Sequence, residues 1–395
     1  MSIKLSHSGI ECYSVCPRKY FLQYKERLSP VAKSSALYQG VAFDAAFNDI
    51  LENFGKKSNE ELIKIGMAAF EKNWIGQEDR NFGYINLVHN PDIIYTKKDF
   101  EEAILTEEDS ERIEGFFQDL RTPPIEVDVD YPFETGYELF QHLRGLHRNF
   151  EHFTKQDKSF YNYVNWLSVK RKAPYFIKAY VENLLPYIEK VVSVQDILST
   201  KDGDGNELTG IADMVLQLKP GTYGGVEVKA EENIISDNKT SSKLYAKDTV
   251  ELSSQLSKYK HILNERGMNI TKGAYFVIVK ELKQIKNKTC KSCGYQTIST
   301  AKTCDQKVNK KRCGGEWSTE ISFEAQTQIV VDEISLETEI KAMEQVDFVV
   351  EQIKAENFEP DITKCDWQFG SPCSYRSFCH NGGDMTGLLK VEKKK

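Results

Sequence analysis

The sequence predicts an α/β protein in which a mixed central sheet is flanked by helices and interrupted by insertions. Short runs rich in β-branched and other apolar residues recur between residues 191 and 332, and segments with helical spacing lie on both sides of them in the chain. With 395 residues, the chain exceeds the usual size of one compact core, so additional modules are expected. We expect five segments: 1–77, 78–190, 191–282, 283–318 and 319–395.

Helices are expected in the first half of the chain. Residues 34–75 have a helical period, because apolar side chains recur every four residues along one face: Ala42, Ala46, Ile50 and Phe54. Residues 78–190 are rich in aromatic side chains and mostly helical in pattern, which predicts a helical insertion. Aromatic residues interleaved with basic ones can stack on the bases of a single strand of nucleic acid, although such aromatics more often fill a core.

Five strands are expected in the rest of the chain, followed by a helix that ends near Ile353. They cover residues 191–199, 207–218, 224–230, 272–280 and 321–332. The segment Asp202–Asn206 has the composition of a tight hairpin turn, and it lacks the paired helices and terminal Glu of a calcium loop. Residues 231–248 are polar and without a period, so we expect a loop there.

One carboxylate and a carboxylate–amine pair lie on neighbouring predicted strands. Asp213 is on the strand expected at residues 207–218, and Glu227 and Lys229 are on the strand expected at 224–230. Residues two apart in a strand face the same side, so Glu227 and Lys229 point together while Val226 and Val228 point into the sheet. Two carboxylates favour hard divalent cations, and a nearby lysine can orient or deprotonate a bound water or stabilise charge on a phosphate. The alternative is an ordinary cross-strand salt bridge.

A predicted helix after these strands adds two polar side chains. Its apolar residues have helical spacing, and Gln255 and Tyr259 are four apart, hence on one face. The order Asp213, Glu227-x-Lys229 and Gln255-x3-Tyr259 resembles the PD-(D/E)XK nuclease superfamily, specifically its RecB-like branch, which includes AddB-type and CRISPR adaptation nucleases.

The resemblance implies a restriction-endonuclease-like core and Mg²⁺- or Mn²⁺-dependent hydrolysis of DNA phosphodiesters. It assigns catalysis to five residues, of which the first two also bind the metal: Asp213, Glu227, Lys229, Gln255 and Tyr259. Where the family usually has a His after Gly-x3, this chain has Asp44, a carboxylate that also suits a hard cation. The implied role is exonuclease action on single-stranded DNA or free DNA ends in recombination, repair or phage DNA processing. The sequence has no Walker A motif, so any helicase would be a partner protein.

Four cysteines at the two ends of the chain form a first metal-binding set. The segment Leu5–Tyr24 is similar to the start of iron–sulfur members of that branch, whose Ser-x-Leu-x-x-Tyr-x-x-Cys-Pro-x-Lys-Tyr pattern supplies the first cluster cysteine, here Cys16. The resemblance assigns Cys365, Cys373 and Cys379 to the same 4Fe–4S cluster. Seven residues separate Cys365 from Cys373, where the commoner form has two. Zinc, or a site without metal, is the alternative.

A second set of cysteines lies within a short segment. Cys290, Cys293, Cys304 and Cys313 are placed in two turns with Gly close after the cysteine, which suits tetrahedral ligation of Zn²⁺ in a small ribbon. Of the nine cysteines, these two sets leave Cys12. Disulfides are the alternative for any such group. They are not expected here, because no secretory signal opens the chain and cytosolic thiols stay reduced.

The charge is unevenly distributed. A net charge of −7 argues against a protein that coats nucleic acid, yet residues 283–313 contain nine basic residues and one acidic residue. This segment is either a DNA contact or a well-solvated ribbon with almost no core. The apolar runs are too short to span a bilayer. We therefore expect a cytoplasmic protein of a bacterium or a phage-infected cell.

Two other functions fit parts of the pattern. A catalytically silent iron–sulfur and zinc module could bind DNA and recruit other proteins, but it would have no reason to retain Asp213, Glu227 and Lys229 together. An iron–sulfur redox or sensor protein would transfer electrons without cleaving DNA, and the sequence has no flavin or nicotinamide fingerprint.

Overall fold

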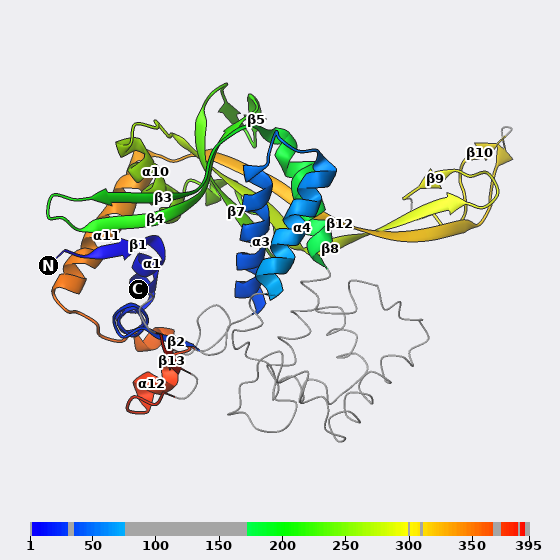
Figure 1. Ribbon diagram of the computed structural model, residues 1–395. Coiled ribbons are helices and arrows are strands. Elements are labelled where there is room, and N and C mark those ends of the chain that lie inside the picture. Colours follow the sequence, from blue (N-terminus) through cyan, green and yellow to red (C-terminus); the bar gives the residue numbers. More distant parts are fainter. Residues whose placement is uncertain are drawn as a thin grey trace, which may run out of the picture.

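The computed structural model describes residues 2–30, 35–75, 172–298, 301–308, 311–365, 373–385 and 388–391. A mixed sheet of seven strands forms its centre, with helices on both faces, which confirms the predicted α/β class (Figure 1). The strands of this sheet are β1 (Lys4–Ser6), β3 (Ile188–Lys201), β4 (Glu207–Leu218), β7 (Asn233–Ser241), β8 (Lys272–Cys290), β9 (Gln296–Thr297) and β12 (Trp317–Glu333).

Strand β4 joins the two halves of this sheet. β3 pairs with it antiparallel along one edge, and the turn between them is the predicted hairpin, in which Asp202 Oδ1 accepts hydrogen bonds from the backbone N–H groups of Asp204 and Asn206. On the other edge, β1 pairs parallel with the start of β4, and β7 pairs antiparallel with its end. β8 lies parallel to β7, and β12 lies antiparallel to β8.

The alternation of side chains along the strands creates two cores, one on each face of the sheet. Helices α3 (Ser35–Glu52) and α4 (Asn59–Ile75), together with residues 172–187, bury the first core, which includes Met214 and Phe276. Helices α1 (His7–Val15), α10 (Ser254–Glu265) and α11 (Leu336–Lys354) bury the second, which includes Val215 and Val277. Residues 34–75, which are expected to be helical, form these two helices, separated by a turn at Gly55 with φ 73°.

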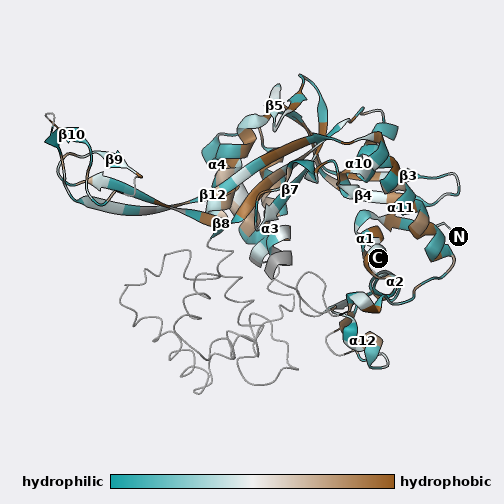
Figure 2. Ribbon diagram, turned by 180° about the vertical axis from the view of Figure 1, so that it is seen from behind, coloured by the Kyte–Doolittle hydropathy of each residue, from teal (hydrophilic) through white to brown (hydrophobic). Residues whose placement is uncertain are grey.

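Strands β8 and β12 continue well beyond the helices as a two-stranded arm (Figure 1). We define the arm as residues 282–325; its tip carries β9 and the hairpin β10 (Lys307–Val308) and β11 (Lys311–Arg312). The sequence placed the ends of these strands at residues 280 and 321, and the structure extends β8 to Cys290 and starts β12 at Trp317. The parts of β8 and β12 inside the body are largely hydrophobic, whereas their parts in the arm are mostly hydrophilic (Figure 2). Hydrophobic patterning therefore predicts strand only for the parts inside the body.

The two ends of the described chain meet below the sheet. β2 (Leu28–Pro30) pairs antiparallel with β13 (Leu388–Lys390), and the buried Tyr375 hydroxyl donates a 2.8 Å hydrogen bond to the carbonyl of Leu28. α2 (Pro17–Tyr20), a π-helical turn (Phe21–Lys25) and α12 (Arg376–His380) complete this region. A small apolar cluster holds it together, formed by Leu22, Leu28, Tyr375 and Leu388.

Two expectations about the segment after β4 are wrong. Of the strand expected at residues 224–230, only β6 (Val226–Val228) forms, and it pairs with β5 (Gly221–Tyr223) in a separate two-stranded sheet. The loop expected at residues 231–248 contains β7, a strand of the central sheet. Most of the predicted helical insertion lies outside the described residues, since of its residues 78–190 the structure describes only 172–190, of which 172–187 contribute to the first core. Within the described part of the chain, no helix is both long and apolar enough to cross a membrane.

Candidate active site and cysteine sites

Three charged side chains meet where β4 and β7 pair. The register sets Met214 opposite Ser236, so Asp213 and Asp237 are neighbours across the two strands. Their carboxyl groups share a hydrogen bond, and the backbone N–H of Asn238 donates to Asp213 Oδ2 over 3.4 Å. Lys239 is two residues farther along β7 and forms an ion pair with Asp237 Oδ2.

Helix α3 adds a third carboxylate to this group. Burial is the largest cause that raises the pKa of Asp44, and the charge of Asp237 raises it further. Asp44 in turn contributes to the pKa of Asp213, which burial, the hydrogen bond and charge of Asp237, and the charge of Asp44 raise to about 9. The structure therefore places the predicted metal ligands Asp44 and Asp213 within one electrostatic cluster.

The charge balance of this cluster fits a divalent cation. Asp44, Asp213 and Asp237 offer only oxygen donors, and Lys239 supplies an ammonium group that lowers the pKa of both Asp44 and Asp213. Fully ionised, the four groups carry a formal charge of −2, and the high pKa of Asp213 reflects the cost of crowding buried carboxylates. Hard cations such as Mg²⁺ and Mn²⁺ prefer carboxylate oxygens, so the donor set suits them.

Helix α10 delivers the predicted pair Gln255 and Tyr259 to the same place. The two side chains hydrogen-bond to each other, and Tyr259 lies within the electrostatic reach of Asp213, Asp237 and Lys239. The buried phenol ring approaches β4 closely, because a Cβ atom built on Gly210 would lie 2.3 Å from Tyr259 Cε1. Gly210 is thus needed three residues before Asp213 so that the ring of Tyr259 can pack against the strand.

His7, the first residue of α1, also lies beside this cluster, although no sequence pattern assigns it a role. Its ring packs edge-on against Tyr259, with 6.5 Å between centroids. Burial, followed by the charge of Lys258, lowers the pKa of His7 to about 4, and Asp237 and Lys239 are among the other charges that act on it. A neutral imidazole therefore stands beside the carboxylates at neutral pH.

The structure does not bring Glu227 and Lys229 to Asp213. Both side chains are exposed on the β5–β6 hairpin, where Glu227 lies opposite Thr222. They line a hollow of about 460 Å³ together with Glu251, Lys272 and other polar residues, none of which belongs to the Asp213 cluster. The alternation predicted for this segment is correct, since Val228 is buried in the first core and Val226 packs against it. The prediction that Glu227 and Lys229 share a site with Asp213 is therefore wrong. The acid and lysine that lie beside Asp213 are Asp237 and Lys239.

The four cysteines in the arm converge on one point. The Sγ atoms of Cys290, Cys293, Cys304 and Cys313 all lie within 4.8 Å of one another. Two Sγ pairs are 3.6 and 3.7 Å apart, close to the roughly 3.8 Å edge of a tetrahedron whose centre is about 2.3 Å from each sulfur. Burial raises the pKa of the Cys290 thiol, but hydrogen bonds from the backbone N–H groups of Cys293 and Ser292 and from neighbouring thiols lower it to about 6. This geometry suits a single tetrahedral metal ion.

The other predicted set assembles from both ends of the chain. Cys16 ends α1, and its Sγ accepts a 3.4 Å hydrogen bond from the backbone N–H of Asp361, while the N–H of Cys373 donates to the carbonyl of Cys365 over 2.9 Å. Burial, then the charges of Cys373, Cys365 and Cys16, raise the pKa of Cys379. Among the described residues, the arm cysteines are grouped within 4.8 Å, whereas neither these chain-end thiols nor the three carboxylates around Asp213 form so close a group. The chain-end thiols act on one another electrostatically but are spaced more widely than the arm set.

Cys12, which the sequence left unassigned, also lies beside this set. Burial raises the pKa of Cys12 to about 11, and Cys16 and Cys373 are among the charges that act on it. α1 contains Cys12 and is capped at its C-terminus by Cys16, so one helix holds His7 at the carboxylate cluster and positions two cysteines at the chain-end set.

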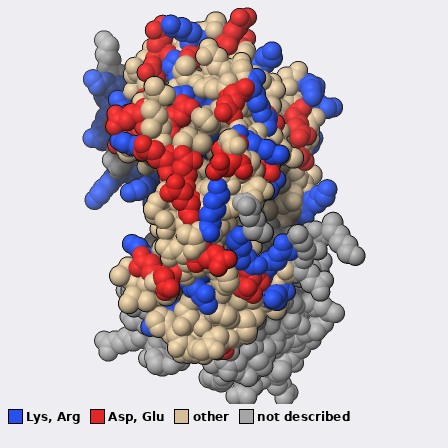
Figure 3. Space-filling view, turned by 90° about the vertical axis from the view of Figure 1, so that its left-hand side faces the viewer, with Lys and Arg blue, Asp and Glu red and all other residues tan. Residues whose placement is uncertain are grey.

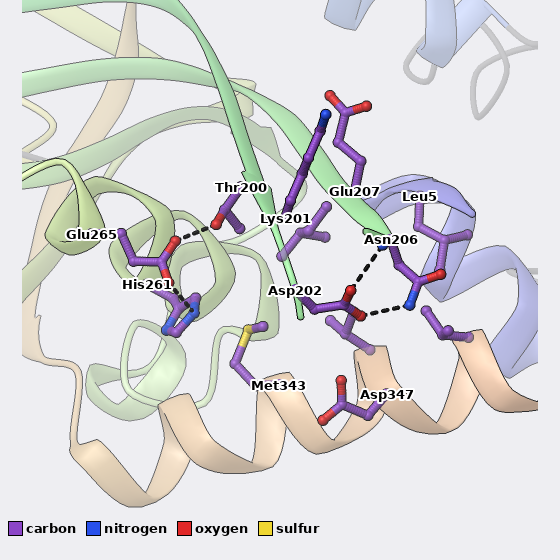
Figure 4. A pocket seen from close by; sticks show the side chains of 13 residues that line it. Leu5, Thr200, Lys201, Asp202, Asn206, Glu207, His261, Glu265, Met343 and Asp347 are labelled. Carbon is purple, nitrogen blue, oxygen red and sulfur yellow. Dashed lines mark hydrogen bonds and ion pairs between the residues drawn. The ribbon is translucent and has the colours of Figure 1, made fainter. Parts of the chain in front are cut away.

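A second hollow, of about 80 Å³, lies between the β3–β4 turn, α10 and α11 (Figure 4). Its polar groups are largely used by the fold. Asp202 accepts from Asn206, and Thr200 donates to Glu265. None of the residues that line it belongs to the Asp213 cluster.

Comparison with known proteins supports an assignment at the level of a family. The family model described as the PD-(D/E)XK nuclease superfamily matches residues 4–380. No curated protein and no solved structure matches the chain. The matched region spans β1, the carboxylates of β4 and β7, α10 and the last of the chain-end cysteines, Cys379. The chain therefore belongs to the PD-(D/E)XK nuclease superfamily, whose nucleases use divalent metals.

Proposed function

We propose that this protein is a DNA exonuclease of the RecB-like branch, acting on DNA ends in recombination, repair or phage DNA processing. The observation that carries the proposal is the electrostatic cluster of Asp213, Asp237 and Lys239 on paired strands with Asp44 of α3, next to the hydrogen-bonded pair Gln255 and Tyr259. Superfamily membership supplies the chemistry, which is metal-dependent phosphodiester hydrolysis.

In this proposal Asp213, Asp237 and Asp44 hold the cation. A bound Mg²⁺ or Mn²⁺ would polarise a phosphoryl oxygen and lower the pKa of a coordinated water. Asp237 has two tasks, because its Oδ2 also fixes the position of Lys239. Asp213 is oriented from the other side by the N–H of Asn238.

Lys239 acts as an ammonium group. Burial alone would lower its pKa, but the charge of Asp237, the hydrogen bond to Asp237 and the charge of Asp213 outweigh burial and raise the pKa. A lysine that keeps its proton stabilises negative charge on the phosphate and does not remove a proton from water. Gln255 and Tyr259 would position substrate or water through their polar ends.

We propose that the two cysteine sets hold different metals. The closely spaced set of Cys290, Cys293, Cys304 and Cys313 suits Zn²⁺, because its Sγ separations match a single ion. The wider set of Cys16, Cys365, Cys373 and Cys379 suits a 4Fe–4S cluster, which holds its cysteine sulfurs farther apart than one ion does. That cluster would tie together the two ends of the described chain.

A nuclease assay with end-labelled linear DNA and circular DNA, each with and without Mn²⁺, tests the function. We expect linear DNA to be degraded from its ends only when the metal is present, and circles to persist. Asp237→Asn should abolish the activity, and Glu227→Gln is the matched control that should leave it unchanged. Cleavage of closed circles would replace exonuclease with endonuclease action. Cleavage that survives Asp237→Asn would remove the proposed site.

A further inference from the structure

We propose that the arm is a second DNA-binding element, which grips the phosphate backbone of duplex DNA at a distance from the scissile bond. This inference deepens the proposed function and rests on it.

The first argument is the charge of the tip. Lys302, Lys307, Lys311 and Arg312 are exposed at the tip, and no salt bridge joins them to another residue of the described chain. The opposite end of the molecule shows Asp and Glu side chains interspersed with Lys and Arg (Figure 3).

The second argument is the pairing within the tip hairpin. β10 and β11 place Lys307 directly opposite Arg312, and Val308 opposite Lys311. Like charges at directly opposed positions destabilise a β-ladder. The hairpin therefore carries a repulsion that phosphate groups would relieve.

The third argument is the separation of charge between the two faces of the arm. The register puts Lys286 opposite Ile321 and Lys288 opposite Thr319, so these four positions share one face of the arm. From Cys290 to Gln284, no paired position on this face is acidic. The opposite face carries both acidic residues of β12 in the arm, and one of them, Glu324, lies opposite Lys283. An unbiased, merely soluble ribbon would mix the two signs on both faces.

The fourth argument is reach, because the arm and the candidate site share a strand. Lys239 pairs with Val277 on β8, and the same strand continues to the metal-binding Cys290. Thirteen residues of extended strand span at most about 44 Å, which is the length of about 13 base pairs of B-DNA. Duplex of this length or more can follow the arm from the carboxylates toward the tip, whereas a duplex of about 10 base pairs, which is about 34 Å long, covers less of it.

The test combines a tip variant with a matched charge control in the full-length protein. The tip variant replaces Lys302, Lys307, Lys311 and Arg312 by Ala. The control replaces four exposed lysines of the body, Lys190, Lys201, Lys341 and Lys354, by Ala and so changes the net charge equally. Binding to a fluorescent duplex of about 40 base pairs is measured against salt concentration in Ca²⁺, and cleavage is measured in Mn²⁺ on duplexes of about 40 and about 10 base pairs.

We expect the tip variant to bind the long duplex at least about tenfold more weakly at low salt, and the slope of log K against log salt to fall by about 3.6, since each lost phosphate contact contributes about 0.9. kcat/KM should fall on the long duplex and stay unchanged on the short one. Bound zinc should be retained, which shows that the tip is folded. An unchanged slope, an equal loss in the control, or tighter binding of the tip to RNA than to DNA would each overturn the proposal. The salt slope requires no cleavage, so an inactive protein would refute the proposed function and leave this inference standing.

Discussion

Two tripeptides of this chain have the same chemical pattern but lie in different structural surroundings. Glu227-Val-Lys229 and Asp237-Asn-Lys239 each set an acid and a lysine two residues apart, the first at the end of β6 and the second within β7. The first lies on an exposed hairpin whose valines face the core, and the second lies inside the central sheet beside Asp213. The chemistry therefore depends on which strand pairs with β4, and the local pattern alone does not decide it.

Replacement of the two lysines should give the largest contrast. Lys239→Gln removes the ammonium group beside the buried carboxylates, and we expect cleavage to fall about 10²–10³-fold, as for the loss of one preorganised charge or donor in an active site. Lys229→Gln should leave the rate unchanged, because the side chain is exposed on the hairpin. Initial rates at saturating Mn²⁺ measure both. The comparison fails if Lys229→Gln is the variant that loses activity.

The second-largest contrast is expected in metal affinity, between variants of Asp237 and of Glu227. Asp237→Asn removes a donor from the carboxylate cluster, and we expect Mn²⁺ to bind more weakly by at least about 10–100-fold, the range seen even for groups that only support a ligand. Glu227→Gln should bind Mn²⁺ as the unaltered protein does. Titration calorimetry without DNA gives both constants. Equal weakening in the two variants would mean that the hairpin takes part in the metal site.

Two glycines sharpen the comparison at the level of packing. Gly210→Ala forces a methyl group into the ring of Tyr259, and we expect a loss of about 1–3 kcal/mol in the free energy of unfolding, together with reduced cleavage. Gly221→Ala, in the hairpin, meets only Tyr223 Cε2 at 3.9 Å and should be nearly neutral. Denaturant unfolding measures both changes. A neutral Gly210→Ala would contradict the close contact between α10 and β4.

The smallest effect is expected from the hairpin surface itself. Glu227→Ala combined with Lys229→Ala changes two exposed side chains, and such substitutions usually alter the free energy of unfolding by no more than about 0.5 kcal/mol. Thermal unfolding of this double variant is the measurement. A larger loss would indicate that the hollow lined by Glu227, Lys229, Glu251 and Lys272 contributes an ordered polar network.

The sequence predicts the parts of the site that depend on local pattern. β4 has the predicted bounds, Glu207–Leu218, because its apolar alternation is strong, and the spacing of Gln255 and Tyr259 sets them on one face of α10. The clustering of Cys290, Cys293, Cys304 and Cys313 follows from short spacings. These features require no knowledge of distant contacts.

What the sequence does not predict depends on pairing between distant segments. β7 begins with the apolar Ile234 and Ile235 but continues through polar residues with the composition of a loop, and it is a strand because β4 and β8 flank it. The signal in the sequence is the buried apolar pair Ile234 and Ile235, which only Ser236 separates from Asp237. His7 reaches the candidate site because β1 pairs with β4, which places α1 beside that strand.

The pairing of β2 with β13 has a consequence for the order of assembly. The chain-end set joins Cys16 to cysteines about 350 positions later, so the ribosome has made every strand of the sheet before the last of these thiols exists. Closure of so long a loop is entropically unfavourable unless the intervening body has already folded and brought its ends together. Metal bound at that point would link the two ends of the described chain as the last step, and only in a molecule whose central sheet and helices have already folded.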